Sequence, residues 1–250
     1  MCAQHASATA SMRAELAVGA PMDPWLRMRL APVPGAHRPG HGATTVRDAL
    51  RAIANAQPDA AMLALELCPV RALLDRERAR LRQRLADGAP AAEIAHAEAR
   101  LLDGTVIGLA HLGRLLAPRS AGIVPPLAVI ARGDYGRQKL APGACADLLF
   151  LVAADPVRRE HGLAIAQFVT RELAGLGWQA SGAKRTVRGC LAETHLDPVI
   201  AADLSAARLV WGCHGLFADL SAGLAEAMRH KQAGAISGRP ERNARPVLAA

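Results

Sequence analysis

The feature that most constrains the fold is a pair of short apolar runs separated by a glycine-containing turn. The first run is residues 128–130, Ala-Val-Ile, and the second is residues 147–152, Asp-Leu-Leu-Phe-Leu-Val. Both have the length of a buried strand, and β-branched and aromatic side chains favour that conformation. The intervening residues 133–142 hold two glycines and end in a proline, which predicts a turn. The expected unit is therefore strand, turn, strand.

Helical patterns downstream extend this unit into an α/β domain. A helix is expected to start at Asp155-Pro156 and to end at Gly175 and Gly177, and a weaker strand is expected within residues 179–187. A last pair of helices is expected to open at residues 196–198 and to reach about Met228. The order strand, turn, strand, helix, strand, helix predicts the α/β class.

Upstream, two long amphipathic patterns predict a helical hairpin over residues 70–86 and about 91–116. An earlier helix is expected to be capped by Thr44-Thr45 and stopped by Pro58. We therefore expect a helical arm over residues 44–120 and an α/β domain over residues 121–228. The charged face of the first hairpin helix is interpreted as a solvated face.

The net charge of +8 is concentrated at the two ends of the chain. Residues 1–51 hold six Lys/Arg against three Asp/Glu, and residues 229–250 hold five against one, which leaves +1 for the rest. The leader 1–43 and the tail 229–250 are rich in glycine and proline or in basic residues, and we expect both to be disordered. A folded basic surface is not implied, and aromatic residues are only 3% of the chain, so nucleic acid is not favoured as a partner. Binding of nucleic acid through the basic ends is a distant alternative.

The five cysteines are scattered and form no CxxC pair, so neither a disulfide framework nor a zinc site is expected. The adjacent Cys213-His214 is a weak metal signal, and buried or idle thiols are the preferred interpretation. No apolar run reaches about 18 residues, so no membrane partner is expected. The expected location is the cytoplasm.

Asp147 is the residue in the turn unit that carries the clearest chemistry. Side chains two residues apart on a strand face the same way, so an acid at position 145 would pair with Asp147. Two such carboxylates beside a glycine turn would hold a magnesium–nucleoside triphosphate. Here position 145 is a cysteine, and a thiol is a poor ligand for magnesium.

The turn unit resembles the nucleotidyltransferase domain of the PII-protein uridylyltransferases. That family carries Gly-Gly-Tyr-Gly-Arg-Gly-Glu-Leu, then Pro, then Ser-Asp-Ile-Asp-Leu-Leu. The residues shared here without a gap are Gly133, Tyr135, Gly136, Arg137, Leu140, Pro142, Asp147, Leu148 and Leu149. The residues that fall at family spacings farther along are Arg185, Thr186, Cys190, Glu193, Asp197, Leu204, Arg208, Leu209 and Gly212. The similarity covers roughly residues 70 to 225 and includes Asp103 in the arm.

The resemblance implies a small mixed-sheet nucleotidyltransferase-like domain of the DNA polymerase β superfamily. It implies transfer of UMP from UTP to a tyrosine of the trimeric PII nitrogen-signalling protein, with Mg²⁺ as cofactor. By resemblance, residues 133–136 (Gly133, Asp134, Tyr135 and Gly136) would line the nucleotide site. Arg137 would support that turn or the triphosphate, and Asp147 would be the catalytic metal ligand. Cys145 would stand at the second, degenerate metal position.

The departures from the family pattern predict that the activity is weakened or lost. They are Asp134 for the second glycine, Gln138-Lys139 for glycine and glutamate, and Cys145 for the first acid. The alternative is an inactive relative that binds a nucleotide or a partner protein. Asp197 is a weak candidate for a third carboxylate, and a helix cap is its preferred interpretation. We expect no counterpart of the family's phosphohydrolase and ACT domains.

Overall fold

The computed structural model describes residues 41–56, 62–117 and 126–237. The chain divides into two compact units, Met1–Pro39 and Gly40–Ala250, and every described residue belongs to the second. The expected disordered leader and tail fall mostly outside the described residues. The exceptions, residues 41–43 and 229–237, are helical.

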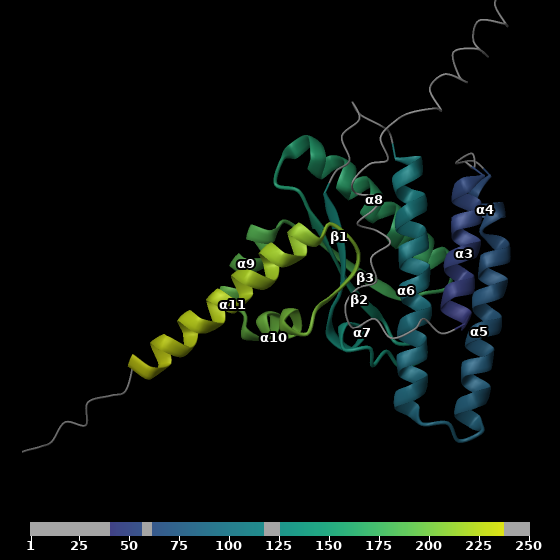
Figure 1. The fold of residues 1–250 in the computed structure, drawn as a ribbon, viewed down its shortest axis with the longest axis horizontal. Helices are drawn as coiled ribbons and strands as arrows, with labels where there is room; N and C mark the ends of the chain where they lie inside the picture. The colour runs from purple at the N-terminus through teal and green to yellow at the C-terminus, as the bar shows by residue number, and fades with distance from the viewer. Residues whose placement is uncertain (1–40, 57–61, 118–125, 238–250) are drawn as a thin grey trace, which may run out of the picture. The chain divides into compact units, whose positions relative to one another are not determined.

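The arm consists of helices α3 (His41–Asn55), α4 (Leu63–Glu66), α5 (Cys68–Ala86) and α6 (Ala91–Leu116). The hairpin α5–α6 lies where the sequence predicts it, and α3 packs beside it (Figure 1). A Cβ on Gly108 of α6 would meet Leu50 of α3 at 2.5 Å, so this glycine allows the two helices to approach closely. The arm is thus a helical hairpin with a third long helix against it.

The start of α3 differs from the expectation. The helix begins at His41, although the Thr44-Thr45 pair predicts a later start. A side-chain cap contributes about 1 kcal/mol, whereas burial of an apolar stripe stabilises a helix through several side chains. Val46 and Leu50 of that stripe are fully buried, so packing rather than capping fixes this helix. Pro58, the expected stop, lies outside the described residues.

The sheet has four strands in the order β3-β2-β1-β4. They are β1 (Leu127–Ala131), β2 (Ala146–Val152), β3 (Ala180–Arg185) and β4 (Arg208–Gly212). β1 pairs antiparallel with both β2 and β4, and β2 pairs parallel with β3 through the crossover helix α8 (Pro156–Gly175). The predicted α/β class and mixed sheet are confirmed.

Helices cover both faces of the sheet, as Figure 1 shows. One face carries Val129, Leu148 and Phe150 toward α6 and α8. The other face carries Ile130 and Leu149 toward α9 (Val187–Leu196) and α11 (His214–Ser237). Because side chains alternate along a strand, burial on both faces explains why β1 and β2 are apolar runs without a polar alternation.

The segment after β3 differs from the predicted pair of helices. It contains α9, α10 (Pro198–Ser205), the strand β4 and then α11, which continues to Ser237 beyond the expected end near Met228. A five-residue apolar run does not distinguish strand from helix by itself. This run is a strand because it pairs with β1, which lies about 80 residues earlier in the sequence.

Candidate functional site

The glycine turn forms a single helical turn, α7 (Gly133–Gly136), directly after β1. Gly133 has φ +54°, and no heavy atom lies within 4 Å of where its Cβ would be, so the space before it is open. Gly136 is confined, because a Cβ there would lie 2.7 Å from the Ala206 carbonyl oxygen. The first glycine therefore supplies a left-handed conformation, and the second allows a close backbone approach.

Tyr135 anchors this turn to the helical arm. Its hydroxyl donates to Oδ1 of Asp103 in α6 at 2.7 Å. Arg208 of β4 donates to both oxygens of the same carboxylate, at 2.9 and 3.0 Å. Burial, followed by the nearby Asp103 charge, raises the pKa of Tyr135 well above its ordinary value. The side chain of Tyr135 therefore lies inside the protein, and any contribution to a nucleotide site would come from its backbone.

Asp147 lies at the start of β2, beside the turn. The backbone N–H of Arg132, the residue before α7, donates to the Asp147 carbonyl oxygen at 2.9 Å. The Asp147 side chain is 33% exposed, so it remains open to solvent. The predicted proximity of the glycine turn and this aspartate is thus present.

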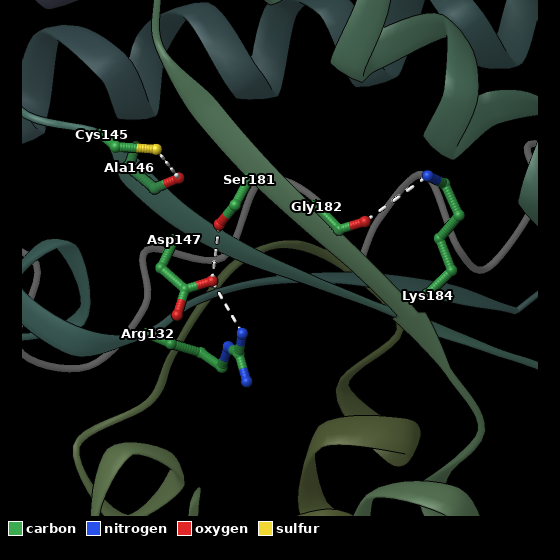
Figure 2. Close-up of polar contacts among 7 residues, drawn as sticks. All are labelled: Arg132, Cys145, Ala146, Asp147, Ser181, Gly182 and Lys184. Atoms are coloured by element: carbon green, nitrogen blue, oxygen red, sulfur yellow. Dashed lines mark hydrogen bonds and ion pairs between the residues drawn. The ribbon is translucent and has the colours of Figure 1, made fainter.

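The carboxylate of Asp147 already has two protein partners (Figure 2). The Arg132 guanidinium donates to Oδ1 at 2.7 Å, and the Ser181 hydroxyl donates to the same oxygen at 2.9 Å. Ser181 pairs with Asp147 across the parallel β2–β3 ladder. One oxygen of the aspartate is therefore held by a cation and a hydroxyl that belong to the chain.

Cys145 is exposed and lies just before β2 begins at Ala146. Its Sγ lies 3.9 Å from the Ala146 carbonyl oxygen, and Figure 2 shows it turned toward that carbonyl. Because β2 begins at Ala146, Cys145 lies outside the strand. The alternation of side chains that would place positions 145 and 147 on one face therefore does not include it. Its role as a metal position stays a prediction from the resemblance.

Arg137 and Asp134 pair with each other at the surface. The Arg137 guanidinium donates to Asp134 Oδ1 at 3.1 Å, and both side chains are exposed. Exposed pairs of this kind contribute about 0–1 kcal/mol, so the pair holds Arg137 only weakly. The predicted roles of both residues toward a nucleotide remain predictions.

The residues around Asp147 do not fit a magnesium ion. Magnesium requires several oxygen ligands in an octahedral arrangement. Within the described part of the chain, no group of three or more His, Cys, Asp or Glu residues could hold a metal. Strand β3 contributes Ser181 rather than an acid opposite Asp147, and the nearest charged group is the Arg132 cation.

Several residues that match the family spacing serve the fold. Thr186 caps α9 by accepting from the Gly189 N–H, and Asp197 caps α10 by accepting from the Val199 N–H at 2.7 Å. Arg185 pairs with Glu193 at 2.5 Å. Burial raises the pKa of the Cys190 thiol to about 11. The preferred interpretation of Asp197 as a helix cap is confirmed.

Sequence reasoning did not identify Arg132 and Ser181 as site residues. Arg132 directly precedes the glycine turn, and this position beside the first strand was the available signal. Ser181 had no such signal, because its place opposite Asp147 depends on the register between β2 and β3.

Comparison with known proteins supports the resemblance. No protein-family model matches the chain. The bifunctional uridylyltransferase/uridylyl-removing enzyme of Thiobacillus denitrificans is 33% identical over 142 residues, 56% of this chain and 16% of that enzyme. The enzyme of the same name from Idiomarina loihiensis is 35% identical over 94 residues, 37% of this chain and 11% of that enzyme. This chain contains a PII-uridylyltransferase-like nucleotidyltransferase region.

The uridylyltransferase-like region corresponds to a small part of those relatives. The enzyme of Azospirillum brasilense repeats the pattern, with 29% identity over 154 residues, 59% of this chain and 16% of that enzyme. Among solved structures, a toxin–antitoxin crystallised with AMP-PNP shares 15% identity, covers 54% of this chain and 93% of that chain, and has a TM-score of 0.33. That score is too low to bear on function. In the described residues no helix is long and apolar enough to cross a bilayer.

Proposed function

We propose that this protein is a uridylyltransferase-like nucleotidyltransferase in which transfer of UMP from UTP to a PII-type protein has been lost. Its remaining function is to bind a nucleoside triphosphate at the Gly133 turn without a divalent metal. The observation that carries the proposal is the contact between Arg132 and Asp147.

The positive charge of the Arg132 guanidinium repels a metal cation at Asp147. Two unit charges 4 Å apart interact by about 4 kcal/mol at an effective dielectric constant of about 20, and a dication doubles that repulsion. The Arg132 side chain is only 19% exposed, so the charge is partly shielded from solvent. Cys145, which stands where the resemblance places the second metal ligand, offers a thiol instead of an oxygen. Both features weaken the binding of a metal ion at Asp147.

Nucleotide binding is supported by the open space at Gly133 and by the weakly held Arg137. A triphosphate without its metal must be neutralised by protein cations. Arg137 is 42% exposed, and its surface pair with Asp134 costs little to exchange for a phosphate contact. The turn could therefore accept an anion without disturbing the buried Tyr135 anchor.

The first prediction concerns transfer and binding measured side by side. The protein is incubated with labelled UTP, Mg²⁺ or Mn²⁺, and a PII-type protein, and we expect no labelled acceptor. Isothermal titration with UTP is expected to give the same affinity with EDTA as with Mg²⁺, because no metal takes part.

Arg137→Ala should weaken UTP binding about tenfold, the effect of losing one charge-assisted hydrogen bond. The matched control is Arg159→Ala, an exposed arginine on α8, which should leave the affinity unchanged. Labelled PII-type protein would contradict the loss of transfer, and UTP binding that requires Mg²⁺ would contradict metal-free binding.

A further inference from the structure

A second candidate site lies between the helical arm and the sheet. It is a cavity of about 250 Å³ lined by α5, by α6, by the loop 142–144 before β2 and by the loop 177–179 before β3. None of the residues that hold the Asp147 carboxylate lines it. The inference drawn from this cavity therefore does not rest on the proposed function.

Glu98 of α6 is a buried carboxylate in the wall of this cavity. Its side chain is 4% exposed, and the nearest cationic atom, Nε of Arg78, lies 3.9 Å away, which is too long for a hydrogen bond. No described residue donates a hydrogen bond to Glu98, and burial raises the pKa of this carboxyl. The Glu98 carboxylate therefore offers the cavity an acceptor that no described residue engages by a hydrogen bond.

Arg78 and Trp178 form another part of the wall. The Arg78 guanidinium lies over the Trp178 ring, 4.0 Å from its centroid, and donates to the Leu176 carbonyl oxygen at 3.3 Å. Trp178 is 6% exposed, and its Nε1–H has no hydrogen-bond partner among the described residues. This stacked pair gives the cavity a rigid side.

Arg82 stands on α5 one turn beyond Arg78, in the part of the wall that faces solvent. It is exposed and forms neither a hydrogen bond nor an ion pair with another described residue. Asp75, also in the lining, is 64% exposed. The charged lining is thus two arginines and two acids, which balance each other.

We propose that this cavity binds a free α-amino acid, whose ammonium group donates to Glu98 and whose carboxylate accepts from Arg82. A lining that balances two carboxylates against two guanidinium groups favours a zwitterion over a simple anion or cation. The volume lies below the range of about 300–1,000 Å³ typical of larger organic ligands, which suits a small metabolite.

The position of the cavity connects its occupancy to the start of β2. Ala144 lines the cavity, and the next residue is Cys145. Gln179, also in the lining, accepts through its carbonyl oxygen from the Ala146 N–H at 2.8 Å. A bound amino acid would therefore touch the segments that position the first residues of β2.

The test is isothermal titration of the whole chain with each standard L-amino acid alone. Propionate and ethylamine, which carry only one of the two charges, are titrated in parallel. At least one amino acid should bind, and the two single-charge compounds should bind at least about tenfold more weakly. Arg82→Ala and Glu98→Gln should each weaken amino-acid binding about tenfold or more, the loss expected for one charge-assisted hydrogen bond.

The matched control is Arg76→Ala, an exposed arginine of α5 outside the lining, which should bind as the unaltered chain does. Thermal unfolding verifies that each variant is folded. If Glu98→Gln does not fold, the affinity of Arg82→Ala alone tests the proposal. The proposal is overturned if no amino acid binds, if propionate binds as well as the amino acids do, or if Arg82→Ala leaves the affinity unchanged.

Discussion

At the scale of single residues, three acidic side chains differ in the contacts that their carboxylates make. Asp147 is held at the surface by Arg132 and Ser181, and Asp103 is held beneath the turn by Tyr135 and Arg208. Glu98 differs from both, because its carboxylate is buried with its nearest cation 3.9 Å away. The sequence identifies these acidic residues, but their structural roles depend on the side chains that each carboxylate contacts in the folded chain.

The pH dependence of stability should reveal the cost of burying Glu98. Burial raises its folded-state pKa above the ordinary value of 4.5, so above that pH the unfolded chain loses this proton more readily than the folded chain. Its contribution therefore lowers stability as pH rises through the window that opens at about 4.5 and ends at the folded pKa. Glu98→Gln should be more stable than the unaltered chain at neutral pH, with the gain vanishing near pH 4. Urea unfolding across this pH range is the measurement, and a constant difference at all pH values would refute the assignment.

At the scale of elements, the predictable pieces are those with a strong local pattern. The apolar runs of β1 and β2 and the long amphipathic α6 are specified by their own residues. The strand β4 was missed because its five residues become a strand only through pairing with β1. For the same reason the sequence predicts that the glycine turn and Asp147 belong to one site, because they are near each other in the chain. It does not predict that Ser181 belongs to it, because Ser181 contacts Asp147 only through the register between β2 and β3.

The contact between arm and turn can be tested by a double-mutant cycle. Asp103→Ala leaves the partly buried Arg208 guanidinium unpaired, and we expect a loss of about 2–3 kcal/mol in the free energy of unfolding. Tyr135→Phe removes one hydrogen bond and should cost about 1 kcal/mol. The double variant should lose less than the sum, because both changes remove the same contact. Additive losses measured by urea unfolding would show that the two side chains do not interact.

At the scale of the whole molecule, a sheet with helices on both faces brings the end of β1 and the start of β2 to one place, with arm helix α6 beneath them. The resemblance predicted a glycine turn beside Asp147 and a degenerate metal position at Cys145. It could not predict that a cation of the chain contacts the remaining aspartate, because position 132 lies outside the residues that carry the resemblance. The scaffold is therefore that of a nucleotidyltransferase-like domain, and its Asp147 is paired with Arg132.

The most direct test of that ion pair is a titration of the chain with Mn²⁺, followed by electron paramagnetic resonance of the unbound ion. The unaltered chain should bind no Mn²⁺ at millimolar concentration, because Arg132 and Ser181 already hold Asp147. The double variant Arg132→Ala with Cys145→Asp should gain binding, and adding Asp147→Asn should abolish that gain. Binding of one Mn²⁺ by the unaltered chain that disappears in Asp147→Asn would contradict the account.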